Sequence, residues 1–357
     1  MKNGKTILCK ENCNFMIKIL IQKILPFFFI FFISCYNEPI NSLVVISGET
    51  QGTTYNIQYL IEDCKGCSDD QQKIYKTEIE KVLSLVDETF SLWNMHSDLT
   101  RINDGEKIKV NSMFKAVFSA AEEIYNETDG MYDCSIAPLT HYWGFTGDYE
   151  KLDNADTSEI YRRLMLVNYS KLKIIDDSIQ LPDGMQLDYN SLVQGYSVDL
   201  ISEIFLKNNV FNFLVEIGGE IRAYGKNIDG ESWIVGIDKP NEKLDLKNRF
   251  QVLLSLDNMS LATSGNYRKF RELNGIKYSH TINPNTGYFA NNKMLSATVI
   301  HESCMLADAY ATAFMSMGIQ ESIAYCKNNQ EVKSYFVYSD DKGNWKVYSS
   351  PNLKILE

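Results

Sequence analysis

One apolar helix with a charge inside it constrains this chain more than any other stretch. Residues 303–318, SCMLADAYATAFMSMG, open with Ser303, a helix-capping side chain, and close with Gly318, which favours helix ends. Almost everything between is apolar or small, so most sides of the helix must be covered. Yet the helix carries Asp308, and an unpartnered buried carboxylate is costly or shifts its pKa. Because the helix contains no Lys, Arg or His, Asp308 needs a partner from outside it.

The overall composition excludes some classes of protein. The chain has 357 residues, 45% of them hydrophobic and 23% charged, which is typical of a folded globular protein. Its formal net charge of −11 argues against nucleic acid as a partner, because nucleic-acid binding relies on basic patches. An anionic ligand would need local positive charge or a metal ion.

The N-terminal segment has the pattern of an export signal. Two lysines, Lys18 and Lys23, precede an apolar core at residues 24–33, which is shorter than a membrane span, and Ser34 and Cys35 follow. This pattern resembles a bacterial lipoprotein signal. We expect residues 1–35 to be the signal, with Met16 as an alternative start and Cys35 as the lipidated first residue of the mature protein. An ordinary cleaved signal and a short anchor are the alternatives.

That reading predicts a location and a domain layout. The mature protein would be an extracytoplasmic lipoprotein, anchored to a membrane of the bacterial cell envelope and exposed on the periplasmic side. Residues 36–47 would form a tether, and residues 48–350 would form the folded domain.

The remaining cysteines leave their chemistry open. Cys64 and Cys67 form a single CxxC in a polar stretch, and no second CxxC completes a zinc site. A local disulfide or two idle thiols are the other readings. Cys304 and Cys326 are typical of small core residues.

The pattern along the chain predicts an α+β fold with mixed, substantially antiparallel sheets and packed helices. Alternating strand-like stretches and helical periodicity are interleaved without a strict βαβ repeat. The expected strands lie within residues 42–61, 171–182, 212–225, 232–240, 250–265 and 295–300, and the expected helices at residues 71–90, 112–128, 191–209 and 303–318.

Turn-rich loops carry an ordered set of motifs. The set resembles the ApbE flavin transferases, also called FAD:protein FMN transferases, over about residues 48–320. It consists of Gln51–Tyr55, Phe90–Asn103, Thr128–Phe145, Leu187–Asp199, Gly218–Gly219, Trp233–Pro240, Thr263–Tyr267, His280–Gly287 and Ala307–Thr312. The resemblance implies an ApbE-like, T-fold-like architecture.

The resemblance also implies a partner for Asp308. In this family the corresponding Asp and Thr hold Mg²⁺ together with a backbone carbonyl, so the ligands here would be Asp308, Thr312 and the carbonyl of Ser191. Hard cations prefer such oxygen ligands. Some relatives carry a further Asp where this chain has Ala311.

Further residues are carried over as contacts to FAD. His280 is the candidate general acid or base, since histidine titrates near neutral pH. Trp93 would stack on the adenine. The implied FAD contacts are Gln51, Trp93, Met131, Tyr132, Asp133, Asp188, Gln194 and Ile282.

The implied reaction is transfer of FMN from FAD to a Thr or Ser hydroxyl of an acceptor protein, with release of AMP. Expected acceptors are flavin-carrying subunits of membrane redox complexes. The alternatives are a metal-dependent FAD pyrophosphatase and a non-catalytic FAD-binding lipoprotein. The chain departs from the family pattern at Asn190 and Ser191, where glycines are usual, and at Gln194, where Lys is usual; losing that Lys could weaken phosphate binding.

Overall fold

A large antiparallel sheet is the base on which the molecule is built. The computed structural model describes residues 41–62, 68–145, 155–240, 249–266, 270–273, 276–279, 281–290, 292–351 and 353–356. The eight strands of the sheet follow the order β1 (Asn41–Thr50), β2 (Thr53–Glu62), β5 (Phe213–Ile217), β6 (Glu220–Tyr224), β9 (Ser260–Gly265), β12 (Met294–His301), β13 (Lys333–Ser339) and β14 (Trp345–Ser349). Every pair from β2 through β14 is antiparallel. The predicted α+β class is confirmed.

Both faces of this sheet are covered, and strand β5 shows how. Successive side chains of a strand point to opposite faces. Phe213, Val215 and Ile217 pack with helix residues on one side, whereas Leu214 belongs to a separate core on the other side. That second core is closed by a three-stranded sheet of β7 (Trp233–Asp238), β8 (Phe250–Leu256) and β15 (Ile355–Leu356).

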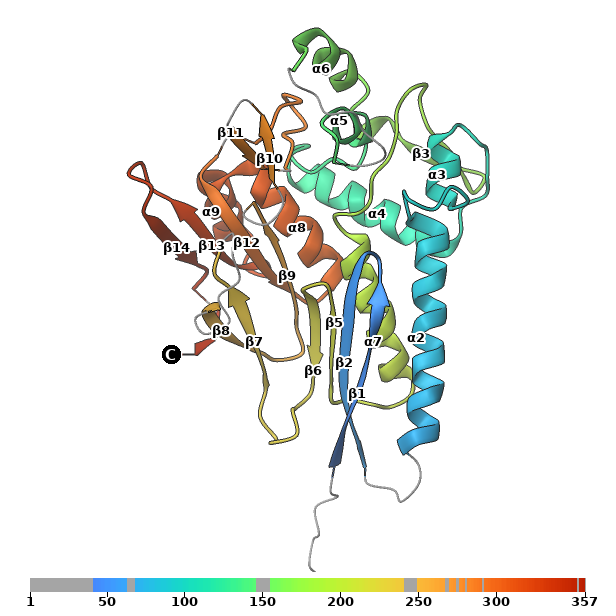
Figure 1. The fold of residues 1–357 in the computed structure, drawn as a ribbon, viewed down its shortest axis with the longest axis vertical. Coiled ribbons are helices and arrows are strands. Elements are labelled where there is room, and N and C mark those ends of the chain that lie inside the picture. The colour runs from blue at the N-terminus through green and yellow to red at the C-terminus, as the bar shows by residue number, and fades with distance from the viewer. Residues whose placement is uncertain are drawn as a thin grey trace, which may run out of the picture. The chain divides into compact units, whose positions relative to one another are not determined.

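Helices cover the first face, and Figure 1 shows α2 (Ser68–Phe90), α4 (Ser112–Glu127), α7 (Val193–Lys207) and α8 (Cys304–Met317) beside the strands. The helices α7 and α8 contact the sheet and each other. The helix α2 packs on α7 and, through Tyr75, on Tyr59 of β2, and α4 packs on α8. The helix α8 is therefore enclosed on most sides, as its apolar sequence predicts. Ser303 caps it by accepting from the Leu306 N–H at 3.3 Å, and Gly318 follows at φ 84°.

The remaining elements are short. They are α3 (Asp98–Asn103), α5 (Ala137–Tyr142), α6 (Thr157–Leu164), η1 (Tyr169–Lys171), β3 (Lys173–Ile175), β4 (Ser178–Gln180), β10 (Phe270–Leu273), β11 (Ile276–Ser279) and α9 (Ile319–Asn328). The buried indole of Trp143, at the end of α5, donates to the carbonyl of Gly287 at 2.8 Å. This bond ties α5 to the loop after β11.

Among the expectations for the N-terminal segment, the structure bears on the boundary between the tether and the folded domain. Strand β1 begins at Asn41, so residues 41–47, which were expected to belong to the tether of residues 36–47, are part of a strand. The strand forms because Val44 and Ile46 alternate into the core. Cys35, Cys64, Cys67 and His280 lie outside the described residues. Among the described helices, none combines the length and apolar character of a membrane span.

Candidate active site

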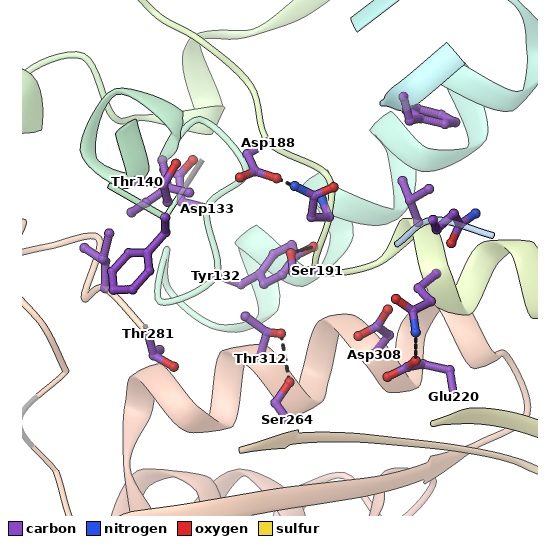
Figure 2. A pocket seen from close by; sticks show the side chains of 18 of the residues that line it. Tyr132, Asp133, Thr140, Asp188, Ser191, Glu220, Ser264, Thr281, Asp308 and Thr312 are labelled. Atoms are coloured by element: carbon purple, nitrogen blue, oxygen red, sulfur yellow. Dashed lines mark hydrogen bonds between the residues drawn. The ribbon is translucent and has the colours of Figure 1, made fainter. Parts of the chain in front are cut away.

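One cavity of about 820 Å³ gathers the predicted site. Of the residues expected to bind FAD or metal, all eleven line it: Gln51, Trp93, Met131, Tyr132, Asp133, Asp188, Ser191, Gln194, Ile282, Asp308 and Thr312. Figure 2 shows several of them on α8, on the loop before α7 and on the loop after α4. The predicted lipidation site, Cys35, and the predicted acid or base, His280, are not among the described residues.

The floor of the cavity is one face of α8. Asp308, Thr312 and Ser316 follow one another at intervals of four residues, so they share that face. The Thr312 hydroxyl shares a hydrogen bond of 3.1 Å with the Ser264 hydroxyl of β9, as Figure 2 shows. The helix therefore presents a carboxylate and a hydroxyl to the same space.

Asp308 is buried with little to balance its charge. It is 6% exposed, and its Oδ2 accepts one hydrogen bond, from the Gly195 N–H at 3.2 Å. Within the described residues no ion pair to a Lys, Arg or His reaches it. Burial, and next the charge of Glu220, raise the pKa of this carboxyl well above its usual range. The described part of the folded protein therefore provides no positively charged partner for Asp308, and the partner that the sequence calls for must come from elsewhere.

Glu220, which the sequence did not mark, lies beside Asp308 in the cavity (Figure 2). It is 8% exposed, and one of its carboxylate oxygens accepts from the Gln194 side-chain amide. The same amide nitrogen also donates to the Ile217 carbonyl at 2.9 Å. A turn at Gly218 allows this approach: its φ is +60°, and a Cβ there would lie 2.0 Å from the Gln194 amide nitrogen. Gly218 is required for both reasons.

The loop before α7 supplies the opposite wall. The Ser191 hydroxyl donates to the Tyr132 hydroxyl at 3.0 Å, which joins this loop to the one after α4. Burial raises the pKa of the Tyr132 phenol well above its usual range, so the group remains a neutral hydroxyl. Asp188 accepts from the Asn190 N–H at 2.9 Å, and burial raises the pKa of its carboxyl as well.

Asp133 lines the cavity, yet its carboxylate is already committed to its own loop. One oxygen accepts from the N–H and hydroxyl of Ser135 at 2.7 and 2.6 Å, and the other accepts from the Tyr169 N–H at 3.1 Å. Asp133 therefore holds the loop that carries Met131 and Tyr132.

The mouth of the cavity is formed by the hairpin turn of β1 and β2 and by the loop after α2. Gln51 adopts φ 49°, and its amide donates to Ser197 of α7 at 2.6 Å, which fixes the turn against that helix. Trp93 lines the cavity and is 68% exposed, so its ring stands at the opening.

The comparisons with known proteins agree with this geometry. The sequence model of the ApbE family matches residues 51–336. The chain is 34% identical over 317 residues to the FAD:protein FMN transferase of Vibrio cholerae, covering 87% of this chain and 92% of that protein. It is 30% identical over 335 residues to the enzyme of the same name from Haemophilus influenzae, covering 91% and 94%. The chain belongs to the ApbE family.

A solved structure of a family member has the same fold. The structure of the flavin transferase ApbE from Vibrio cholerae superposes with a TM-score of 0.77 at 32% identity, covering 87% of this chain and 98% of that one. The predicted family resemblance is confirmed.

The charge of the ApbE-type cavity decides what it can bind. Its described lining contains no Lys, Arg or His but contains the acidic residues Asp87, Asp133, Asp188, Glu220 and Asp308. An anionic diphosphate would be repelled by such a cavity unless a cation entered with it.

The donor atoms fit Mg²⁺ better than a transition metal. No group of three or more His, Cys, Asp or Glu side chains able to hold a metal comes together in the part of the chain that the structure describes. What the cavity offers is the Asp308 carboxylate, the Thr312 hydroxyl and the Ser191 loop, which together are an oxygen-only set. Mg²⁺ is typically bound by one or two carboxylates, with phosphate or water completing its coordination.

Proposed function

We propose that this chain transfers FMN from FAD to a Thr or Ser hydroxyl of an acceptor protein and releases AMP. The observation that carries the proposal is that one cavity brings together the expected FAD-contact positions and Asp308. Asp308 is a buried carboxylate to which no positively charged side chain of the described residues is paired. The names and coverage of the family members add support.

The proposed metal ligands are Asp308, Thr312 and the backbone carbonyl of Ser191. The oxygen-only donor set and the burial of Asp308 support this assignment. A bound Mg²⁺ would supply the positive charge that offsets the two phosphates of FAD. The acidic residues that line the cavity support the need for such a cation.

The chain's own residues would orient the nucleotide. Trp93 at the mouth offers a ring for stacking on the adenine, and such stacking contributes about 1–3 kcal/mol. Gln194 is held by its bonds to Glu220 and Ile217, so its orientation is set before the ligand arrives. Met131, Tyr132, Asp188 and Ile282 would line the remainder of the FAD site.

The proposed chemistry is an in-line displacement. The acceptor oxygen forms a bond to the FMN-side phosphorus, and the bond from that phosphorus to the AMP oxygen breaks. His280 would take the hydroxyl proton or protonate the leaving group. Its chain neighbour Thr281 lines the cavity, which supports a place for His280 in the reaction.

The location and the acceptor are part of the same proposal. The signal pattern ending at Cys35 supports a lipid-anchored protein on the periplasmic side of the cell envelope. Acceptors exposed there, such as flavin-carrying subunits of membrane redox complexes, fit an enzyme in that position.

The test is incubation of the purified chain with FAD, Mg²⁺ and a purified acceptor, followed by mass spectrometry of the acceptor and the nucleotides. We expect the acceptor to gain the mass of FMN and AMP to appear in equal amount. FMN and AMP without modified acceptor would indicate a pyrophosphatase instead. Retained FAD without any AMP would indicate a non-catalytic FAD-binding protein.

A further inference from the structure

Asp199 on α7 holds the beginning of α8. Its two carboxylate oxygens accept from the Cys304 N–H at 3.0 Å, the Met305 N–H at 3.0 Å and the Ser303 hydroxyl at 2.8 Å. Arg222 of β6 pairs with the same carboxylate at 2.9 Å. Only 14% of the Asp199 side chain is exposed. These bonds satisfy N–H groups that the first turn of a helix leaves without partners.

A second contact joins the same two helices one turn away. Gly195 lies four residues before Asp199 on α7, and Asp308 lies four residues after Cys304 on α8, so each pair shares a helix face. The Gly195 N–H donates to Asp308 at 3.2 Å. Gly195 of α7 therefore contacts Asp308 of α8, whereas Asp199, one turn further along α7, contacts the first residues of α8.

The helices touch closely between these two contacts. A Cβ on Gly195 would lie 2.4 Å from the Cys304 carbonyl oxygen and 3.0 Å from the Asp308 Cβ. The separation of the helices is therefore set by backbone packing. The bonds from Asp199 to the first residues of α8 act along a different direction, because they restrain how far α8 can slide along α7.

We propose that Asp199 is a positioning residue, which sets the place of the Asp308 carboxylate for cation binding by holding the start of α8 against α7. The proposal rests on the proposed function, since it takes Asp308 as a cation ligand. Among the described residues, one hydrogen bond restrains the Asp308 carboxylate directly, so the position of its helix decides where the oxygens lie. Mg²⁺ tolerates little error, because it demands near-ideal geometry at 2.0–2.1 Å.

The experiment measures Mn²⁺ binding by electron paramagnetic resonance in the absence of FAD. Asp199→Asn keeps the shape of the side chain, but it removes the charge and one oxygen acceptor. We expect Mn²⁺ to bind about 10-fold to 100-fold more weakly, the usual loss when a residue that orients a ligand is changed. Ser303→Ala removes one bond to Asp199 together with the cap that accepts from the Leu306 N–H. It should weaken binding by about 3-fold to 10-fold and serves if Asp199→Asn does not fold.

The matched control is Asp156→Asn, the same substitution at another helix start. Asp156 caps α6 by accepting from the Ser158 N–H at 2.8 Å, and α6 carries none of the cavity residues. We expect Asp156→Asn to bind Mn²⁺ like the parent even where it lowers Tm.

Three outcomes would overturn the proposal. If folded Asp199→Asn and Ser303→Ala bind Mn²⁺ with parent affinity, Asp199 does not position the site. If Asp156→Asn weakens binding as much as Asp199→Asn, the effect is general destabilisation. If the parent binds no Mn²⁺, or binds it equally well after Asp308→Ala, the cation site is wrong and the role of Asp199 is wrong with it.

Discussion

The two ends of the contact between α7 and α8 each carry an aspartate, and the two carboxylates have opposite surroundings. At one end, Asp199 accepts three hydrogen bonds and pairs with Arg222. At the other, Asp308 accepts one hydrogen bond and faces a second carboxylate, Glu220. The bonds to Asp199 hold the beginning of α8 in place. The Asp308 carboxylate keeps negative charge that a bound cation can balance. The supply of donors, rather than burial, separates a structural carboxylate from a binding one.

The largest effect should come from removing the underpartnered carboxylate. Asp308→Ala deletes the only side-chain charge among the proposed metal ligands and little volume. We expect Mg²⁺-dependent FMN transfer to fall by about 10³-fold or more, because the charge on the phosphates is no longer offset. Single-turnover transfer to an acceptor, followed by mass spectrometry, measures the loss.

Asp87→Asn is the matched control, since it neutralises another acid of the same cavity that is not a proposed ligand. Its transfer rate should stay within a few-fold of the parent. Full Mg²⁺-dependent activity in Asp308→Ala would contradict the metal assignment.

A smaller effect should follow from a substitution that pushes α7 and α8 apart. Gly195→Ala places a methyl group 2.4 Å from the Cys304 carbonyl, so the helices must separate. We expect a loss of about 1–3 kcal/mol in the free energy of unfolding, as in other overpacked sites. Urea unfolding followed by circular dichroism measures it. Because Gly195 lies inside α7 and Ala is intrinsically favoured over Gly within a helix, any loss of stability reports the clash rather than a change in helix propensity. Unchanged stability in Gly195→Ala would mean that the close packing between the helices is not needed.

The smallest effect concerns pH in the absence of metal. The raised pKa of Asp308 means that the folded state favours the protonated form. This contribution to stability is complete below the unfolded pKa, near 3.9, and is lost as the pH rises through the folded value. Asp308→Asn removes the dependence. In EDTA its Tm should equal that of the parent at pH 4 and exceed it by about 1–2 °C at pH 8, the shift that a difference of about 1 kcal/mol produces in a chain of this length.

Adding Mg²⁺ at pH 8 should reverse that order, because only the parent carries the ionised ligand. Thermal unfolding in EDTA and in Mg²⁺ provides both comparisons. A Tm difference that stays constant between pH 4 and pH 8 would refute the burial argument.

Much of the site could be predicted because its motifs are local. Asp188, Ser191 and Gln194 lie within one loop and the turn that follows, and Asp308 and Thr312 lie one helical turn apart. A resemblance in short segments is enough to find such residues. The long helices and the central strands follow from periodicity in the same way.

What could not be predicted depends on partners far away in the chain. Glu220 follows two glycines, and nothing local shows that it meets Gln194 and Asp308. The loop-fixing role of Asp133 depends on Tyr169. The short helix α5 reads as a turn-rich loop, because its stability comes from tertiary contacts such as the one from Trp143 to Gly287. Strands β13 and β14 and helix α9 lie beyond the last motif, so the resemblance does not reach them.

The walls of the cavity come from nearly opposite ends of the chain. Gln51 lies on the first hairpin, and Thr312 and Ser316 lie on α8, more than 250 residues later. A growing chain therefore cannot form a complete cavity until α8 has been made, and closing it requires long-range contacts that form slowly. Any ligand that binds across these walls stabilises the first hairpin and α8 together, by mass action. Ligand capture is thus coupled to the completion of folding, and a chain truncated before α8 would lack the floor of the cavity.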